Sequence, residues 1–289
     1  MSFVYLEGEF VEEKEAKISV FDRGFQFGDG AYATIQVKEG VPLFLESHLE
    51  HLEKQCLSFH LLMPPVSRDT IEELIVRNQA FQGIWRLKIF ITGGDSPEMS
   101  LPKRAGRVVA ILKPFTPEPF KALSLGIFSI PYSSCHAPYK SLAHLNRFYV
   151  MEEAKRNGLD DCVTLTEKGV LLEASFGNLL WVYEKTVMTP DPSLPLYFGI
   201  TLKNILNLAK EMGFEIKYVK WSLNELPQEA AAFRTNTMQG IRPIVQINGL
   251  DFKRNPTVET LLIQGYEKLK EEQKSLCKSI PATFSLGNK

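Results

Sequence analysis

Four short stretches of the sequence carry residue types that could act together on one small molecule. Lys140 precedes a segment expected to be helical, and Glu173 lies in "LLEASFGNLLWV", a run typical of strands. "GIT" at 199–201 opens another expected helix, whose first N–H groups and dipole would favour an anion. Hydroxyl and amide groups of "TNT" at 235–237 could add further donors. Together these stretches offer an amine nucleophile, a carboxylate and an anion site.

Pyridoxal chemistry needs this combination of groups. It requires a lysine for the Schiff base, a group matched to the pyridine nitrogen, and donors that hold a phosphate. Lys140 is the candidate for the first requirement and Glu173 for the second. The residue types alone also allow Lys140 and Glu173 to be ordinary surface residues, because single lysines and glutamates lie mostly on solvated surfaces.

The order of these motifs resembles that of a known family, the class IV PLP-dependent aminotransferases. This family includes D-amino-acid and branched-chain aminotransferases and the aminodeoxychorismate lyases. The resemblance runs from about Val4 to Ile247 and rests mainly on "DRGFQFGDG" at 22–30, "YKSL" at 139–142 and "EASFGNL" at 173–179. It implies pyridoxal 5′-phosphate (PLP) as the cofactor.

The resemblance also implies a reaction, for which alternatives remain. The first is transamination between an amino acid, of D-amino-acid or branched-chain type, and a 2-oxo acid. The second is an aminodeoxychorismate lyase reaction that releases pyruvate and 4-aminobenzoate, and "HLNR" at 144–147 resembles a lyase helix. The third is a non-catalytic descendant of the family that acts as a binding protein.

Individual site residues follow from the same resemblance. Lys140 is expected to be the Schiff-base lysine and the proton shuttle, and Glu173 the partner of the pyridine nitrogen. Tyr32 is expected to line the substrate pocket. The residues implied for the phosphate are Ile200, Thr201, Asn236 and Thr237.

The sequence departs from the family pattern at several positions. His51, in "HLEHL" at 48–52, stands where the family usually has an arginine for the phosphate. It could be a protonated imidazole that faces the phosphate or a solvated helix histidine. Ala33 and Ala143 replace the usual Glu and Asn, and "ITGG" at 91–94 lacks an arginine. These three changes are expected around the substrate or cofactor pocket, so the substrate class stays open.

Other polar residues have competing interpretations. Arg242 and Arg234 flank "TNT" and could pair with a substrate carboxylate, although a surface position is at least as plausible for each. His48 and His51 lie three residues apart, but they have no carboxylate or thiolate nearby in the sequence, so no metal site is expected. The glycines of "GDG" at 28–30 lack the context of a phosphate loop and predict a tight backbone turn.

Periodicity predicts an α/β (α+β) chain. Alternating segments at 3–8 and 16–22 and a Glu39–Gly40 hairpin turn indicate an antiparallel start, and helices are expected over 45–59 and 68–80. Later helices are expected over 142–157, near 199–213, and from Asn255 onward, between short strands. The polar tail after Cys277 is expected to be loosely held.

The proline-rich segment "KPFTPEPFK" predicts a linker between two lobes. We expect a small α/β domain over 1–117, a linker over 118–123 and a larger PLP-binding domain over 124–289. The resemblance implies a fold type IV arrangement, in which the small lobe has two layers and the larger lobe has a barrel-like sheet. It also implies a homodimer with sites between the lobes.

Composition excludes several other classes of protein. The chain has 33 Lys and Arg against 34 Asp and Glu and shows no basic stripe, so nucleic acid is a poor partner. There is no apolar run of membrane-spanning length and no leader-like start. The cysteines Cys56, Cys135, Cys162 and Cys277 show no regular spacing, which favours free thiols in the cytoplasm.

Overall fold

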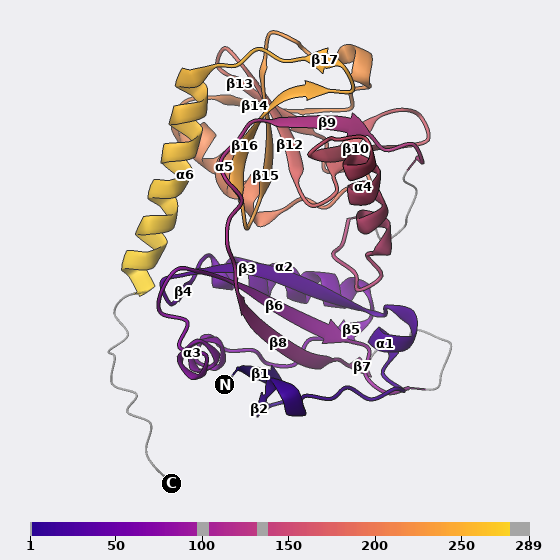
Figure 1. The fold of residues 1–289 in the computed structure, drawn as a ribbon, viewed down its shortest axis with the longest axis vertical. Coiled ribbons are helices and arrows are strands. Elements are labelled where there is room, and N and C mark those ends of the chain that lie inside the picture. The colour runs from indigo at the N-terminus through magenta and orange to yellow at the C-terminus, as the bar shows by residue number, and fades with distance from the viewer. Residues whose placement is uncertain (1, 97–103, 132–137, 278–289) are drawn as a thin grey trace.

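The computed structural model describes residues 2–96, 104–131 and 138–277 of the chain (Figure 1). Cys135 and the tail after Cys277, which were considered above, lie outside these ranges. The helices in the described residues are α1 (Arg23–Phe27), α2 (Leu45–Ser58), α3 (Arg68–Arg77), α4 (Leu145–Arg156), α5 (Ile200–Glu211) and α6 (Pro256–Cys277). None of them is long and apolar enough to cross a membrane.

The N-terminal part of the chain forms a six-stranded antiparallel sheet in the order β2-β1-β8-β6-β3-β4. Its strands are β1 (Phe3–Leu6), β2 (Glu9–Glu12), β3 (Gly30–Lys38), β4 (Val41–Pro42), β6 (Ile84–Thr92) and β8 (Arg107–Pro114), and β5 (Leu61–Leu62) pairs separately with β7 (Arg104–Ala105). The apolar stripe of α2, including Leu45, Leu52 and Cys56, is buried with Ile35 and Ile89 of the sheet. Helix and sheet thus share one core, as the three- and four-residue spacing predicts.

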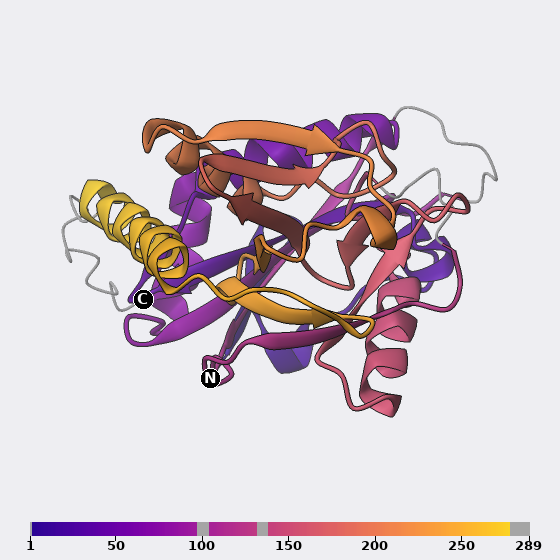
Figure 2. The same ribbon diagram turned by 90° about the horizontal axis from the view of Figure 1, so that it is seen from above.

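The rest of the chain forms a nine-stranded mixed sheet that curls into a half-barrel, with the main order β11-β10-β9-β16-β15-β12-β13-β14. The strands are β9 (Leu123–Ile127), β10 (Asp161–Leu165), β11 (Leu171–Ala174), β12 (Asn178–Tyr183), β13 (Thr186–Pro190), β14 (Glu215–Val219), β15 (Ala231–Asn236), β16 (Gly240–Ile247) and β17 (Leu250–Asp251). Figure 2 shows the curl from above. Helices α5 and α6 pack on the outer side of this sheet through a core that includes Leu206, Phe233 and Leu262. The predicted barrel-like sheet is therefore confirmed.

The two sheets lie one above the other in Figure 1, and the chain passes between them through residues 115–122. β8 ends at Pro114, within the start of the proline-rich segment, and β9 begins at Leu123, so residues 115–122 contain no helix or strand. The expected linker over 118–123 overlaps these residues except for Leu123, which begins β9, and the division into domains stays a prediction.

Most of the expected elements are present, but two differ. The expected strand at 16–22 is wrong: apart from an isolated bridge from Asp22 to Asp95, these residues pair with no strand in the described chain, and Ile18, Val20 and Phe21 are exposed. An alternating pattern of apolar and polar residues does not by itself provide a neighbouring strand with which to pair. The helix expected from Leu142 begins at Leu145 instead, because the preceding residues are held to the first sheet as described below.

The "GDG" segment makes the predicted tight turn. Gly28 ends α1 in the left-handed conformation with φ 68°, and a Cβ there would lie 2.8 Å from the Ala143 Cβ. Gly30 has φ 155°, and a Cβ would lie 2.2 Å from the carbonyl oxygen of Ile91. Only glycine fits such close approaches. The turn therefore brings the start of β3 against the segment that carries Lys140.

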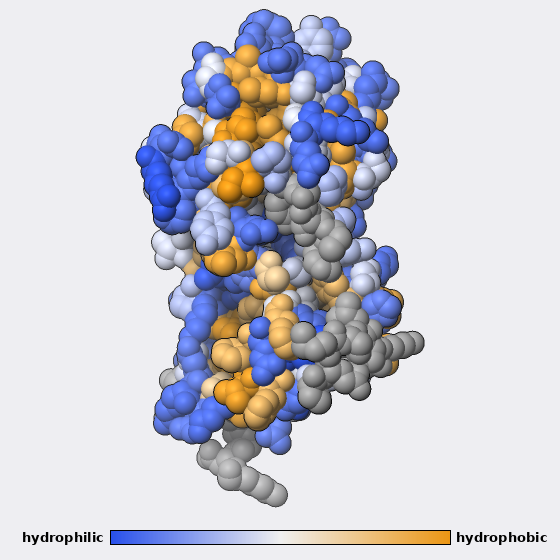
Figure 3. Space-filling view, turned by 90° about the vertical axis from the view of Figure 1, so that its right-hand side faces the viewer, coloured by the Kyte–Doolittle hydropathy of each residue, from blue (hydrophilic) through white to orange (hydrophobic). Residues whose placement is uncertain are grey.

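Exposed apolar side chains gather around α1 and α4, which lie on the same side of the molecule (Figure 1). Figure 3 shows that side, with hydrophobic areas on both the upper and the lower part. The large exposed side chains on these two helices are Phe25, Phe27, Leu145, Phe148 and Tyr149. Apolar surface of this kind on one face is typical of a protein contact.

Candidate active site

The backbone of Lys140 is attached to the first sheet. Its carbonyl accepts a hydrogen bond from the N–H of Tyr32 at 2.9 Å, and its N–H donates to the Oε1 of Gln55 at 2.6 Å. The N–H of Leu142 donates to the carbonyl of Gly30 at 3.1 Å. Lys140 therefore lies in an extended segment beside β3 rather than directly at a helix start. These bonds fix the point from which its side chain extends.

Glu173 lies in β11 and is buried, with 5% of its surface exposed. Its Oε1 accepts a hydrogen bond from Arg147 Nη2 at 3.0 Å and one from the N–H of Tyr197 at 3.2 Å. Arg147 also donates from Nη1 to the carbonyl of Ser175 at 2.6 Å. Burial raises the pKa of Glu173, and the Arg147 guanidinium opposes this shift. The carboxylate is held in one orientation by donors from two separate elements.

The start of α5 provides a place for an anion. Gly199, the residue before the helix, has no side-chain capping bond in the described structure, and the first N–H groups of a helix have no partner within it. Asn178 fixes this end, because its Oδ1 accepts from the N–H of Gly199 at 3.1 Å and its Nδ2 donates to the carbonyl of Tyr197. Facing it, the Oγ1 of Thr235 is buried and has no hydrogen-bond partner among the described residues. These groups are open to a ligand that accepts hydrogen bonds.

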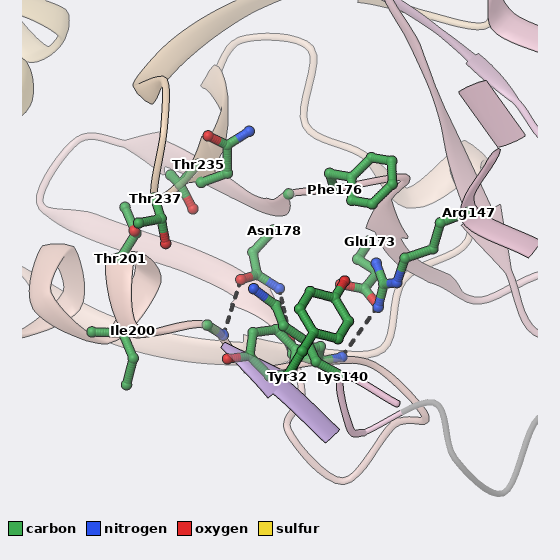
Figure 4. Close-up of a pocket in the computed structure, with 14 residues that line it drawn as sticks. Tyr32, Lys140, Arg147, Glu173, Phe176, Asn178, Ile200, Thr201, Thr235 and Thr237 are labelled. Atoms are coloured by element: carbon green, nitrogen blue, oxygen red, sulfur yellow. Dashed lines mark hydrogen bonds and ion pairs between the residues drawn. The ribbon is translucent and has the colours of Figure 1, made fainter. Parts of the chain in front are cut away.

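One cavity is lined by these groups (Figure 4). Its lining includes seven of the predicted site residues, namely Tyr32, Lys140, Glu173, Ile200, Thr201, Asn236 and Thr237. In Figure 4, Glu173 and Arg147 lie on one side of the pocket and Ile200, Thr201 and Thr237 on the other, with Lys140 and Tyr32 between them. The structure thus brings together the residues that the sequence placed on four separate stretches.

The side chain of Lys140 lies between two aromatic rings. Its Nζ is 4.6 Å from the ring centroid of Tyr197 and 5.7 Å from that of Tyr32. Burial, helped by the positive charge of Arg147, lowers the pKa of Lys140 to about 8. A useful fraction of the amine is therefore unprotonated near neutral pH, as a nucleophile requires.

The lowered pKa predicts how the protein without cofactor reacts with an amine-selective acylating reagent. Only the neutral amine reacts, so the rate at Lys140 should rise about tenfold per pH unit up to pH 8 and level off above it, since the pKa is about 8. A model lysine peptide in the same reaction should continue to gain reactivity up to about pH 10. Mass spectrometry of the modified peptides gives both rates. Parallel curves for Lys140 and the model peptide would contradict the structure.

His51 does not line the cavity but packs behind it. Its ring lies edge-on to Tyr197 with centroids 5.2 Å apart, and its Nδ1 is 3.4 Å from Lys203 Nζ. Its Nε2 is buried without a partner among the described residues. The interpretation as a solvated helix histidine is therefore wrong. Burial, reinforced by the charge of Lys203, lowers the pKa of His51 to about 4, which makes the imidazole neutral at pH 7 in these surroundings.

The two arginines near "TNT" are used elsewhere. Arg242 donates to the carbonyls of Pro119 at 3.1 Å and Glu118 at 2.9 Å, so it holds the linker and does not line the cavity. Arg234 donates to Asp161 Oδ2 at 2.7 Å in a buried ion pair. The structure therefore does not bring either guanidinium to the pocket.

Two of the departures from the family pattern also lie away from the cavity. Ala33 is buried in the core of the first sheet, because alternation along β3 turns it away from the face of Tyr32. Ala143 packs against Gly28. The expectation that these positions surround the pocket is wrong for Ala33, since strand register decides which face a side chain occupies.

Sequence reasoning missed several of the lining residues, among them Arg147, Asn178 and Tyr197. Arg147 and Asn178 lie inside motifs that were recognised, "HLNR" and "EASFGNL", but nothing in their spacing shows that they contact Glu173 and the start of α5. Tyr197 lies in an irregular segment before α5 and carries no periodic signal. Arg147 and Asn178 contact residues 26 and 21 positions away, and Tyr197 is placed by a loop. Local sequence patterns do not predict contacts of either kind.

Comparison with known proteins agrees with this arrangement. The model of the family Amino-transferase class IV matches residues 30–247. A putative branched-chain-amino-acid aminotransferase of Methanocaldococcus jannaschii is 27% identical over 281 residues, which cover 94% of this chain and 96% of that protein. The aminodeoxychorismate lyase of Bacillus subtilis is 26% identical over 257 residues, covering 86% and 88%.

Among solved structures, the branched-chain aminotransferase of the archaeon Thermoproteus uzoniensis with norvaline superposes with a TM-score of 0.84. It is 22% identical, and the match covers 96% of this chain and 97% of that one. The two sheets with a pocket between them therefore define an enzyme of fold type IV. The chain belongs to the class IV aminotransferase family, whose cofactor is PLP.

The residues of the pocket fit this cofactor. An aldehyde needs the amine of Lys140, and a pyridine nitrogen needs an acid such as Glu173 at the opposite side from the phosphate. The open start of α5 and the unpartnered Oγ1 of Thr235 suit phosphate oxygens. The aldehyde, the ring nitrogen and the phosphate of the cofactor thus each have a chemically matched group in one cavity.

Proposed function

We propose that this enzyme transfers an amino group between an amino acid, of D-amino-acid or branched-chain type, and a 2-oxo acid. The observation that carries the proposal is the shared cavity in which Lys140, Glu173 and the open start of α5 meet. The similarity to aminotransferases over nearly the whole chain supports it. When bound, PLP supplies an electron-accepting ring that stabilises charge at the substrate Cα.

The proposed roles of the chain's own residues follow from their surroundings. Lys140 Nζ, with its pKa lowered to about 8, binds the cofactor and then takes and returns the proton at the substrate Cα. Glu173, held by Arg147 and the Tyr197 N–H, keeps the proton on the ring nitrogen. Ile200, Thr201, Asn236 and Thr237 hold the phosphate. Tyr32 covers the side of the pocket next to Lys140.

His51 is proposed to contribute to the phosphate end indirectly. It lies between Tyr197, which lines the cavity, and Lys203 of α5. A neutral imidazole with an unpartnered Nε2 can donate or accept one hydrogen bond without carrying a charge. It would then differ from an arginine, which presents a permanent charge to the phosphate.

The test is turnover by protein reconstituted with PLP. The holoenzyme should absorb at about 400 nm, a general property of lysine-bound PLP. It should sustain turnover of amino acid to 2-oxo acid, beyond the amount that the bound cofactor itself accepts, only when a 2-oxo acid acceptor is present. A panel of L- and D-amino acids, including branched-chain ones, identifies the substrate and its chirality. Absence of the band, or of any conversion across the panel, would contradict the proposal.

The alternative reaction is elimination of pyruvate from aminodeoxychorismate. It is favoured by the 26% identity to the Bacillus subtilis lyase over most of both chains. Pyruvate and 4-aminobenzoate released without any acceptor would identify the lyase. A strict requirement for the acceptor would identify the aminotransferase.

We further propose a homodimer in the cytoplasm. The exposed apolar side chains of α1 and α4 support a self-contact on the side shown in Figure 3. Cys56 and Cys162 are free and buried, which suits a reducing compartment. Sedimentation of the wild type and of a Phe25→Ser/Tyr149→Ser variant tests the dimer, because the variant should sediment as a monomer.

A further inference from the structure

Lys88 lies on the face of the first sheet that is turned toward the second. In the antiparallel register of β3 and β6, Lys88 stands opposite Thr34, next to the pair formed by Tyr32 and Phe90. Alternation puts these four side chains on one face and Ile89 on the other, where it is buried in the apolar core. Lys88 is therefore on the same face as Tyr32, a residue of the pocket wall.

Two contacts show that this face looks toward the cofactor site. Gln36, two residues beyond Thr34 on the same face, donates to the carbonyl of Met238 at 3.2 Å, in the loop that follows Asn236 and Thr237. The Tyr32 ring is also shared: Lys140 Nζ and Lys88 Nζ each lie 5.7 Å from its centroid. The distance between Lys88 Nζ and Lys140 Nζ is therefore at most twice 5.7 Å.

The ammonium group of Lys88 has no carboxylate partner in the part of the chain that the structure describes. It is half-buried and near the rings of Tyr32 and Phe90, and it makes no hydrogen bond or ion pair with another described residue. Its charge acts on the pocket, since it lowers the pKa of both Lys140 and His144. Burying half of a cation without a partner costs desolvation free energy, and a bound anionic ligand would offset this cost.

The other cations around the cavity are already engaged. Arg147 is paired with Glu173, and Arg234 with Asp161. Arg242 binds the carbonyls of the linker, and Lys140 is the reactive amine. Apart from the reactive amine of Lys140, Lys88 is the one among these described cations that no carboxylate or carbonyl of the chain satisfies.

We propose that Lys88 binds a carboxylate of the substrate and thereby helps to determine which amino acids and 2-oxo acids are accepted. This inference rests on the proposed function, because it assigns a substrate group to the same pocket. A lysine is suited to this role as a compact charge on a flexible stem. The carboxylate is either the one on the reacting carbon or one at the far end of a dicarboxylic substrate.

The test compares Lys88→Gln with the wild-type holoenzyme. Removing one charged hydrogen bond should raise KM for the amino acid and the 2-oxo acid about 10- to 100-fold and change kcat much less. Lys88→Arg should restore most of the affinity. Arg86→Gln is the matched control, since Arg86 is exposed two residues earlier on the same strand face and its loss should leave KM unchanged.

The substrates separate the two sources of the carboxylate. If Lys88 binds the carboxylate on the reacting carbon, KM rises for monocarboxylic and dicarboxylic amino acids alike. If it binds the distal carboxylate, KM rises for dicarboxylic substrates only. Both results support the proposal, whereas KM values equal to wild type for every substrate would overturn it.

Calorimetric titration of the holoenzyme with unreactive propionate and glutarate provides a readout without turnover. Weaker binding by Lys88→Gln than by Arg86→Gln is expected for at least one of these acids. This measurement tests the role of Lys88 separately from the proposed function. A wild type that binds these acids through Lys88 but converts no amino acid would contradict the proposed function alone. A wild type that turns over but binds them equally after Lys88→Gln would contradict the role of Lys88 alone. Thermal unfolding confirms that the variants fold.

Discussion

Protein with Lys140→Ala is expected to lose the absorbance at about 400 nm and nearly all turnover when PLP is added. In the proposed function, the side chain at this position supplies both the covalent attachment and the base at the substrate Cα. A positioned acid–base group contributes about 10²- to 10⁴-fold to the rate, so kcat should fall by at least about 10³-fold. Borohydride reduction followed by peptide mass spectrometry should place the cofactor on Lys140 in the wild type and nowhere in the variant.

The controls separate chemistry from folding. Lys140→Arg keeps a positive charge between Tyr32 and Tyr197 but cannot form the bond, so it should be as inactive as Lys140→Ala. Lys121→Ala removes an exposed lysine that pairs with Asp160, and because neither residue lines the pocket, the variant should retain full activity. Residual turnover above about 10% of wild type in Lys140→Ala, well above the loss expected for such a group, would show that another residue carries the reaction.

Glu173→Gln is expected to lower kcat by about 10²- to 10³-fold, the range for removing one electrostatic contact to the reacting group. The amide cannot keep a proton on the ring nitrogen, so the ring becomes a weaker electron acceptor. Attachment of the cofactor to Lys140 should persist, because that bond forms elsewhere in the cavity. Steady-state kinetics and the borohydride assay on the same preparation distinguish the two effects.

The environment of Glu173 makes this prediction specific. Gln has nearly the same shape and can still accept from the Tyr197 N–H and Arg147, which otherwise bond Oε1 at 3.2 Å and 3.0 Å. Loss of activity would thus come from the missing charge rather than from a lost contact. Glu152→Gln, on the exposed side of α4 and paired with Lys155, is the control and should be unaffected. Equal kcat for Glu173→Gln and wild type would exclude Glu173 as the partner of the ring nitrogen.

Several features of the fold follow from local sequence. Spacing at three and four residues placed α2, and Leu45, Leu52 and Cys56 are buried as it predicts. Glu39 and Gly40 form the predicted hairpin turn, with φ of 50° and 82°. Asn255 caps α6, since its Oδ1 accepts from the N–H of Val258. Such features depend on residues that are neighbours along the chain.

The sequence predicts which residues line the candidate site but not the contacts that hold them in place. Lys140, Glu173 and the residues at 200–201 and 236–237 were singled out because their motifs recur in a fixed order, and all of them line one cavity. Arg147, which holds Glu173, and Gln55, which holds the backbone of Lys140, were given no role. These contacts join residues 26 and 85 positions apart, and sequence separation of that size carries no geometric signal.

The sequence by itself therefore determined the family, the order of the elements and the residues able to do the chemistry, because motifs and periodicity are local. Tertiary structure decided which of them meet. It turned Ala33 into the core and Lys88 toward the pocket through strand register, and it directed Arg242 to the linker. The physical reason is that each of these choices depends on packing between the two sheets, which only the folded chain establishes.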